Sequence, residues 1–395
     1  YDMLASSIIA NGSSSTLCGG SINVSSGNFV DGTCVSLPNG ADSDGVIHPT
    51  ASNSDRTFTL EPSDNLSYGT TYQVGVTIGV QDELGNNMTS QYTHASSFTT
   101  SPLLASSTAD VFVAVGQNGT ILRSTDNGAN WDNETCQIFT TLNGVTYGNG
   151  NFVAVGDSGR IIKSTDNASS WENSTSGTSS TLRGVTYGNG NFVAVGDIYT
   201  IRSSTDGSSW TPRYSSSYYA LYGVAYGNST FAGVGYRYTV SSSNLTNWSW
   251  LDAPNVRDLN HRAVTYGGGS TFLGVGQNGK IIRSTNNGQN WDNVTSGDTS
   301  YPPSWGSSTL YGVAYGNSIF VAVGAGGTIL TSANGSSWIS RDSPTTNILY
   351  GVAYGNSTFV AVGAGGTILT SADGSSWTSR TSRTSNILYG VTFGE

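Results

Sequence analysis

A short turn that begins with serine and ends with tryptophan recurs seven times in this chain, about 40 residues apart. The turns occupy residues 124–131, 164–171, 204–210, 242–248, 284–291, 332–338 and 371–377. A fixed period of this length, carrying short alternating strands, is typical of a radial or linear array of small sheets. The repeat therefore constrains the fold of about three quarters of the chain. It says less about function, because the repeated residues are those that build a scaffold.

Each repeat predicts a four-stranded antiparallel meander, clearest near the C-terminus. The expected strands are 349–356, 359–363, 366–371 and 377–380, separated by Gly-Asn, Gly-rich and Asp-Gly turns. Such a small sheet cannot bury both faces alone, so neighbours must pack face to face around an axis. Small residues such as Gly351 and Ala353 suit a crowded inner strand, whereas Phe359, Val362 and Trp377 suit the space between blades.

The two ends of the repeat region predict a closed ring. The first repeat begins at 111–116 without the strand that opens the others, and the chain ends with that missing strand at 388–395. The C-terminal strand should therefore complete the first blade. Six whole repeats and this divided one predict a seven-bladed β-propeller over residues 111–395.

The repeated turns resemble the Asp-box (BNR) motif Ser-x-Asp-x-Gly-x-x-Trp of sialidases and related propellers, although not every turn keeps the aspartate: Asn286 and Asn244, for example, replace it. Residues 111–395 also resemble the seven-bladed propellers of the photosystem II assembly-factor type. We expect the aspartates to accept hydrogen bonds inside their own turns and the tryptophans to pack beneath them, on the outer rim. These structural residues are Asp126, Trp131, Asp166, Trp171, Asp206, Trp210, Trp248, Trp291, Trp338, Asp373 and Trp377.

Residues 1–101 carry a different pattern and predict an Ig-like β-sandwich, joined to the propeller by a linker at 102–110. Strands are expected at 58–62, 68–77 and 97–100, with a loop at 79–86. This region resembles bacterial Ig-like domains of the S-layer type, in which one or two strands precede the segment matched here by 2–8. The sandwich is therefore expected to be incomplete at its N-terminus. The chain is then expected to polymerise by accepting a strand from another copy.

The composition favours a protein outside the cell and excludes several classes. Charged residues make up 10% of the chain, against roughly 25% in ordinary soluble proteins. Either glycans or neighbouring subunits cover such a surface, or the chain is one of the Ser/Thr/Asn-rich β-proteins common outside cells. The net charge of -10 argues against nucleic-acid binding. No run of 18 apolar residues predicts a membrane span, and no leader is visible at the start of the chain.

Cysteines and sequons fit that location. Cys18 and Cys34 flank one Gly/Ser-rich stretch and form a candidate local disulfide, which leaves Cys136 over. About 14 Asn-x-Ser/Thr sequons permit N-glycosylation, a mild excess over chance. The candidate glycosylation sites are Asn11, Asn65, Asn133, Asn173, Asn247 and Asn356.

Nothing in the sequence predicts catalysis, a cofactor or a metal. A sialidase needs an arginine triad and an Arg-Ile-Pro signature near its start, and no such signature is present. No Ser/His/Asp set, phosphate loop or metal-ligand spacing is present either. Asp157 and Asp197 occupy equivalent turns of adjacent blades, where a pair of turn-stabilising residues is favoured over an acid/base dyad. The three histidines, His48, His94 and His261, lie far apart. The mouth of the central channel is expected to offer mainly Gly, Tyr, Val and Leu.

Aromatic residues in the connections are the better candidates for binding. Tyr199, Tyr214, Tyr236 and Tyr238 lie in turns or connections of the third and fourth blades. Blade-to-blade connections and second-to-third-strand turns emerge on the same face of a propeller, so these rings should cluster there. Either they contact a partner or they pack on one another as plugs of the loops. The hypothesised binding residues are Tyr218, Tyr219, Trp250, Tyr301 and Trp305.

Together these patterns predict a non-enzymatic extracellular or cell-surface protein, a structural or adhesive subunit of a filament or layer. Its expected partners are copies of itself, other surface proteins or glycans. The alternative is a glycan-binding module or an Asp-box-type glycoside hydrolase, which would place carboxylates or arginines at the channel mouth.

Overall fold

The computed structural model divides the chain into two compact units, residues 1–107 and 108–395. It describes residues 110–134, 139–198, 200–213, 219–251, 260–294 and 308–395, together with the backbone of short strands in the first unit. Every described element is a strand or a short 3-10 turn. No helix in these described parts is long and apolar enough to cross a membrane.

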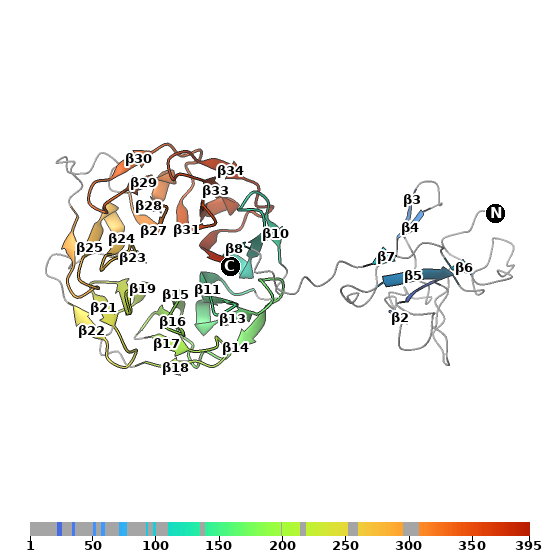
Figure 1. The fold of residues 1–395 in the computed structure, drawn as a ribbon, viewed down its shortest axis with the longest axis horizontal. Helices are drawn as coiled ribbons and strands as arrows, with labels where there is room; N and C mark the ends of the chain where they lie inside the picture. Colours follow the sequence, from blue (N-terminus) through green and yellow to red (C-terminus); the bar gives the residue numbers. More distant parts are fainter. Residues whose placement is uncertain are drawn as a thin grey trace. The chain divides into compact units, whose positions relative to one another are not determined.

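The first unit contains antiparallel strands (Figure 1). One sheet has the order β2-β1-β5-β6, with β7 also paired to β5, and β3 pairs with β4. β5, β4 and β7 fall where the sequence predicts strands. The bounds are β1 (Ile22–Ser25), β2 (Cys34–Val35), β3 (Thr50–Ser52), β4 (Thr57–Thr59), β5 (Thr71–Val76), β6 (Tyr92–Thr93) and β7 (Phe98–Thr99).

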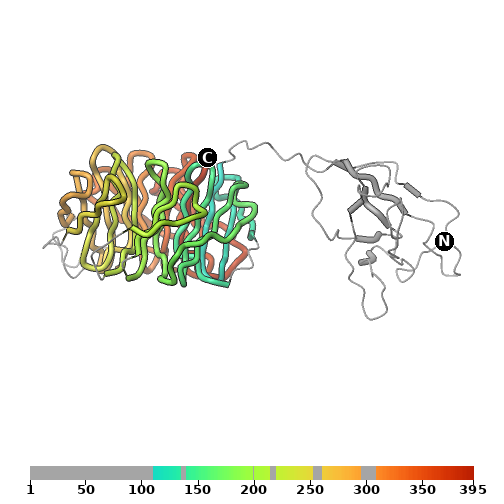
Figure 2. The backbone as a smooth tube through the Cα atoms, turned by 90° about the horizontal axis from the view of Figure 1, so that it is seen from below, coloured from blue at the N-terminus to red at the C-terminus, as the bar shows by residue number. Residues whose placement is uncertain are grey.

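The second unit is a seven-bladed propeller, as predicted. Figure 1 looks along its axis, and Figure 2 shows each blade running back and forth across the thickness of the disc. Each blade is a four-stranded antiparallel sheet. The innermost strands of blades 1 to 7 are β35 (Leu388–Gly394), β11 (Leu142–Gly148), β15 (Leu182–Gly188), β19 (Leu221–Gly227), β23 (His261–Tyr266), β27 (Leu310–Gly316) and β31 (Leu349–Gly355).

The second and third strands are largely buried on both sides because each blade is covered by its two neighbours. The second strands are β8 (Val111–Gly116), β12 (Asn151–Gly156), β16 (Asn191–Gly196), β20 (Thr230–Gly235), β24 (Phe272–Gly276), β28 (Ile319–Gly324) and β32 (Thr358–Gly363). The third strands are β9 (Ile121–Ser124), β13 (Ile161–Ser164), β17 (Ile201–Ser204), β21 (Thr239–Ser242), β25 (Ile281–Ser284), β29 (Ile329–Ser332) and β33 (Ile368–Ser371).

The fourth strands are short and form the outer rim. They are β10 (Asp132–Asn133), β14 (Glu172–Ser174), β18 (Thr211–Pro212), β22 (Ser249–Leu251), β26 (Asp292–Asn293), β30 (Ile339–Arg341) and β34 (Thr378–Arg380). In five blades a 3-10 turn joins the second strand to the third. These turns are η2 (Gln117–Gly119), η3 (Asp157–Gly159), η4 (Gln277–Gly279), η5 (Ala325–Gly327) and η6 (Ala364–Gly366).

The C-terminal strand closes the ring, as the sequence predicts. β35 pairs antiparallel with β8, with Val391 opposite Ala114 and Phe393 opposite Phe112. β35 also contacts the inner strands β11 and β31 of the neighbouring blades. The last strand of the chain is thus the inner strand of the first blade.

Glycines let the inner strands approach one another around the axis. A Cβ added at Gly351 would lie 2.9 Å from the Tyr389 carbonyl oxygen of the next blade, and one at Gly312 would lie 2.9 Å from the Tyr350 carbonyl oxygen. Real Cβ atoms essentially never come so close to backbone, so these positions demand glycine. This confirms the prediction that small residues fill a crowded inner strand.

Candidate functional site

The repeated serine-to-tryptophan turns, here called Ser–Trp turns, are closed by their own hydrogen bonds. In the first, Ser124 Oγ accepts from the Gly128 N–H at 2.9 Å and donates to Asp126 Oδ1 at 2.9 Å. Trp131 Nε1 donates to the Gly128 carbonyl oxygen at 2.9 Å. Each group therefore satisfies a neighbour in the same turn, which is the local role expected from the sequence.

The aspartates of these turns have a structural role as hydrogen-bond acceptors. Backbone N–H groups of Ser376 and Ser375 lower the pKa of Asp373, and the Ser208 N–H with the Ser204 hydroxyl lowers the pKa of Asp206. Hydrogen bonds to the ionised form stabilise it. These carboxylates are thus held ionised, a state suited to accepting hydrogen bonds and unsuited to general-acid work.

Ser–Trp turns also connect neighbouring blades. Arg123 Nε donates to the Asn167 carbonyl oxygen at 2.6 Å, and Lys163 Nζ donates to Ser208 Oγ at 3.1 Å. In each pair the cation lies on the third strand of one blade and the acceptor lies in the turn of the next. The turns therefore stabilise the ring by linking neighbouring blades, which is a structural role.

One face of the propeller carries the turns between second and third strands together with the blade-to-blade connections; we call it the loop face. Every inner strand begins there with a β-bulge, one residue after its first buried side chain. The bulged residues form a set of seven around the axis, which we call the axial ring. Its members are Asn143, Arg183, Tyr222, Arg262, Tyr311, Tyr350 and Tyr389.

One side of the axial ring consists of three adjacent tyrosines, Tyr311, Tyr350 and Tyr389. Ring centroids of Tyr311 and Tyr350 are 5.0 Å apart, and those of Tyr350 and Tyr389 are 5.1 Å apart. Burial, together with the neighbouring Tyr311 and Tyr389, raises the pKa of the Tyr350 hydroxyl. The Tyr350 phenol therefore stays neutral at physiological pH, and the three adjacent rings offer apolar surface and hydroxyl groups.

Another part of the ring combines two arginines with the fourth tyrosine, Tyr222. The Arg183 and Arg262 guanidinium carbons lie 5.3 Å and 4.8 Å from the centroid of the Tyr222 ring between them. Both distances lie within the range of cation–π attraction. This arrangement corrects the expectation that the mouth of the channel offers mainly Gly, Tyr, Val and Leu, because two arginines project from the inner strands there.

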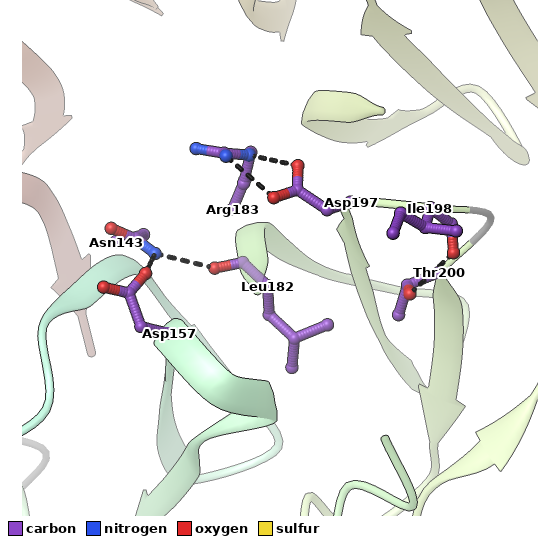
Figure 3. A network of polar contacts seen from close by, with 7 residues as sticks. All are labelled: Asn143, Asp157, Leu182, Arg183, Asp197, Ile198 and Thr200. Atoms are coloured by element: carbon purple, nitrogen blue, oxygen red, sulfur yellow. Dashed lines mark hydrogen bonds and ion pairs between the residues drawn. The ribbon is translucent and has the colours of Figure 1, made fainter. Parts of the chain in front are cut away.

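The two arginines differ in their electrostatic partners, and Figure 3 shows the partner of Arg183. Arg183 makes a bidentate ion pair with Asp197, Nε to Oδ1 at 2.6 Å and Nη2 to Oδ2 at 2.8 Å, and hydrogen bonding to Asp197 raises the pKa of Arg183. Arg262 has no carboxylate partner among the described residues, and its buried Nε has no hydrogen-bond acceptor. Within the described part of the chain, the ring therefore has one cation, Arg262, without a counter-ion.

The equivalent aspartates Asp157 and Asp197 anchor ring residues and make no contact with each other. Asn143 Nδ2 donates to Asp157 Oδ1 at 2.9 Å and to the Leu182 carbonyl oxygen at 3.0 Å (Figure 3). Asp197 likewise pairs with Arg183. Each aspartate therefore holds the axial-ring residue of its own blade. This arrangement supports structure and offers no acid/base dyad.

Four of the aromatic residues in blade 4 and the connection before it come together on the loop face. The Tyr219 ring lies 5.6 Å from Tyr236 and 4.9 Å from Tyr238, and Tyr238 meets Trp250 edge-on at 6.2 Å. Trp250 lies within β22, opposite Val240, which corrects its placement in a connection after the blade. The other hypothesised binding residues, Tyr218, Tyr301 and Trp305, lie outside the described residues, as do Tyr199 and Tyr214.

The remaining candidates have mixed outcomes. His261 is buried in blade 5, where the other inner strands begin with leucine. The predicted Cys18–Cys34 disulfide, Cys136 and the sequons at Asn11 and Asn65 fall outside what the structure describes. No group of His, Cys, Asp or Glu that could hold a metal occurs among the described residues. Four candidate sequons are exposed on the propeller: Asn133, Asn173, Asn247 and Asn356.

The axial ring was missed because each repeat contributes a single residue to it. The signal was nevertheless present in the sequence, as the variable second position of each inner strand, directly after a leucine in six blades and after His261 in blade 5. An alignment of the repeats against one another would have shown three consecutive tyrosines and two arginines at that position.

Comparison with known proteins supports both units. The family described as "Bacterial Ig-like domain" (Big_5) matches residues 4–100, so the N-terminal unit is an Ig-like domain. The search of curated proteins finds no match. The S-layer relationship expected from the sequence goes beyond this match.

Among solved structures, the propeller is similar to "YCF48 bound to D1 peptide", with a TM-score of 0.53, 17% identity and coverage of 67% of this chain and 91% of that one. YCF48 from Cyanidioschyzon merolae gives a TM-score of 0.52 at 16% identity, covering 68% and 97%. The RRP9 WD40 repeats give 0.51 at 8% identity, covering 64% and 83%. At these identities the likeness shows the fold alone.

Proposed function

We propose that this chain is a non-enzymatic binding protein whose propeller holds a polypeptide segment of a partner on the loop face, centred on the axial ring. The observation that carries the proposal is the ring itself. It places three adjacent tyrosines beside Arg262, a cation without a described carboxylate partner. Aromatic residues and arginine are the side chains most enriched at the energetic centres of protein interfaces. A similar propeller has been solved bound to a peptide, which supports this class of ligand.

The test uses a phage-displayed library of random 12-residue peptides, selected on the full chain. Selected peptides are then synthesised, and their dissociation constants are measured by fluorescence anisotropy. Arg262→Gln and Tyr350→Ala should each weaken binding about tenfold or more, as loss of a central interface side chain does. Arg341→Gln, on the outer strand β30, is the matched control and should leave binding within about twofold. Equal binding by all three variants would contradict the proposal.

The proposal that the chain is not an enzyme is supported by the state of its carboxylates on this face. Asp157 and Asp197 are each held by a side chain of the axial ring. The rival of the Asp-box type is a glycoside hydrolase. Its test is hydrolysis of 4-nitrophenyl glycosides and of 4-methylumbelliferyl sialic acid. Turnover by the wild-type chain that is lost in Asp197→Asn would establish the rival.

We further propose that the protein acts at the cell surface, as an adhesive or structural subunit that contacts copies of itself or other surface proteins. The Ig-like domain and the charge-poor composition support this location. Protease treatment of intact cells should remove the protein, whereas a cytoplasmic control protein should persist. Assembly through the Ig-like domain predicts fibres or layers in negative-stain images of the purified chain. A uniform field of isolated particles would contradict that part of the proposal.

A further inference from the structure

A second feature of the loop face lies beside the axial ring, across blades 3 and 4. Its six residues, here called the blade 3–4 patch, are Ile198, Tyr219, Tyr236, Arg237, Tyr238 and Trp250. Ile198 and Tyr236 are among the large apolar or aromatic side chains most exposed in the described chain, at 66% and 40%. They lie in equivalent turns of adjacent blades, so the patch spans the boundary between two blades.

Ile198 is held in a backbone conformation that its side chain disfavours. Its φ is 41°, in the left-handed region, where a β-branched residue is a true outlier. The equivalent positions of the five blades with a 3-10 turn hold Asn118, Ser158, Asn278, Gly326 and Gly365, all of which tolerate that region better. An isoleucine that is both strained and exposed lowers stability without adding to the core, which motivates a role in contact with a ligand.

The patch is continuous with the axial ring. Ile198 directly follows Asp197, whose carboxylate binds Arg183 of the ring (Figure 3). On the other side, Tyr219 lies three residues before Tyr222, the ring residue that Arg183 and Arg262 flank. A polypeptide that lies on the ring can therefore extend outward over the patch without leaving the loop face.

The chemistry of the patch fits a peptide better than a sugar. Sugar-binding platforms use a flat ring face, whereas Tyr219 is tilted by 44° and 34° against Tyr236 and Tyr238. The guanidinium of Arg237 lies 5.8 Å from the Tyr219 centroid, and its buried Nε has no hydrogen-bond acceptor. The exposed aliphatic side chain of Ile198 and the guanidinium of Arg237, in equivalent turns of adjacent blades, suit an apolar residue followed by a carboxylate.

We propose that the blade 3–4 patch is the specificity site for the peptide bound at the axial ring, and that it recognises an apolar side chain next to an Asp or Glu. This inference rests on the proposed function. Peptides selected from the same 12-residue library should share such a pair. Ile198→Asn and Tyr236→Ala should each weaken their binding about tenfold or more.

The matched control is Ile339→Asn, because Ile339 is 57% exposed on β30, at the outer rim. It should leave the dissociation constant within about twofold. Ile198→Asn should also raise Tm, since Asn tolerates the left-handed region, so weaker binding in this variant cannot come from unfolding.

The outcomes separate this inference from the proposed function. Peptides weakened by Arg262→Gln but not by Ile198→Asn or Tyr236→Ala would overturn the inference and leave the axial ring as a binding site. A library that yields no enriched peptide, or peptides insensitive to all three variants, would overturn both. Binding to a neutral-oligosaccharide array that is lost in Tyr236→Ala, with peptide binding unchanged, would assign the patch to glycans and also overturn the inference.

Discussion

At the scale of single residues, the candidate binding residues of this propeller lie at positions where the residue type differs from blade to blade. The first residue of the inner strand is leucine in six blades and histidine, His261, in blade 5. The next residue varies between Asn, Arg and Tyr, and it builds the axial ring. Because the scaffold residues around these positions stay the same, each substitution is presented in the same geometry.

His261 predicts a pH dependence of stability. It is 1% exposed, its Nε2 has no hydrogen-bond partner, and burial lowers its pKa from 6.5 to about 4. Between those two pH values His261 is protonated in the unfolded chain but stays neutral in the folded chain. The unfolding free energy should therefore fall as the pH drops from about 6.5 to about 4. The full loss corresponds to about 3 kcal/mol. Below pH 4 both states are protonated and this contribution stops changing.

The measurement is urea unfolding of the wild type and of His261→Leu from pH 4 to pH 8. Leucine is the residue of the six other inner strands, so it should fit the site. The difference in unfolding free energy between the two proteins should grow in favour of the variant as the pH falls below 6.5. Parallel curves over this range would show that His261 titrates normally, since the carboxylates contribute equally to both proteins.

The site could be predicted from the sequence only in part, for physical reasons. The Ser–Trp turns are local, so the roles of residues such as Asp126 and Trp131 follow from a few neighbouring positions. The axial ring depends on closure, since Tyr389 reaches Tyr350 only when the last strand joins the first blade. Ion pairing such as that of Arg183 with Asp197 depends on side-chain geometry that periodicity does not encode.

At the scale of elements, the Ser–Trp turn is the unit that joins strands and blades. Its serine is buried and its hydroxyl serves two partners at once. In blade 7, Ser371 Oγ accepts from the Gly374 N–H at 2.8 Å and donates to Asp373 Oδ1 at 3.1 Å. Asp373 Oδ1 in turn accepts from the Ser375 and Ser376 N–H groups. The turn therefore has few unsatisfied polar groups despite its short length.

Removing that hydroxyl should destabilise the propeller. Ser371→Ala leaves the buried Gly374 N–H without an acceptor, which costs about 1–3 kcal/mol. Ser376→Ala is the matched control, because the Ser376 side chain is exposed and its bond to Asp373 comes from its backbone. Urea midpoints measure both, and the control should lie within about 0.5 kcal/mol of the wild type. Equal effects would show that the serine hydroxyl is not a structural acceptor.

At the scale of the whole molecule, the repeat made the fold predictable, because the strand positions predicted in one blade apply to the other blades as well. The strands of blade 7 match their expected positions, and the count of seven follows from the divided first blade. The Ig-like unit was harder to predict, since it has no internal repeat to average over. Of its described strands, β1, β2, β3 and β6 had not been located from the sequence.

Closure by β35 gives the last prediction, that residues 388–395 hold the whole ring together. Deleting them removes the inner strand of blade 1, leaves the β8 edge unpaired, and uncovers side chains such as Val111 and Val115, which are fully buried in the intact chain. An unpaired apolar edge is unstable and prone to association. The deletion variant should therefore unfold at a much lower temperature, and it should aggregate. A synthetic peptide of residues 384–395, added in trans, should restore Tm in a concentration-dependent way, because a ligand that binds only the folded state stabilises it by mass action. A scrambled peptide of the same composition serves as the control. If the truncated chain melted at the wild-type temperature, or if both peptides acted alike, the C-terminal strand would not be the closing element of the propeller.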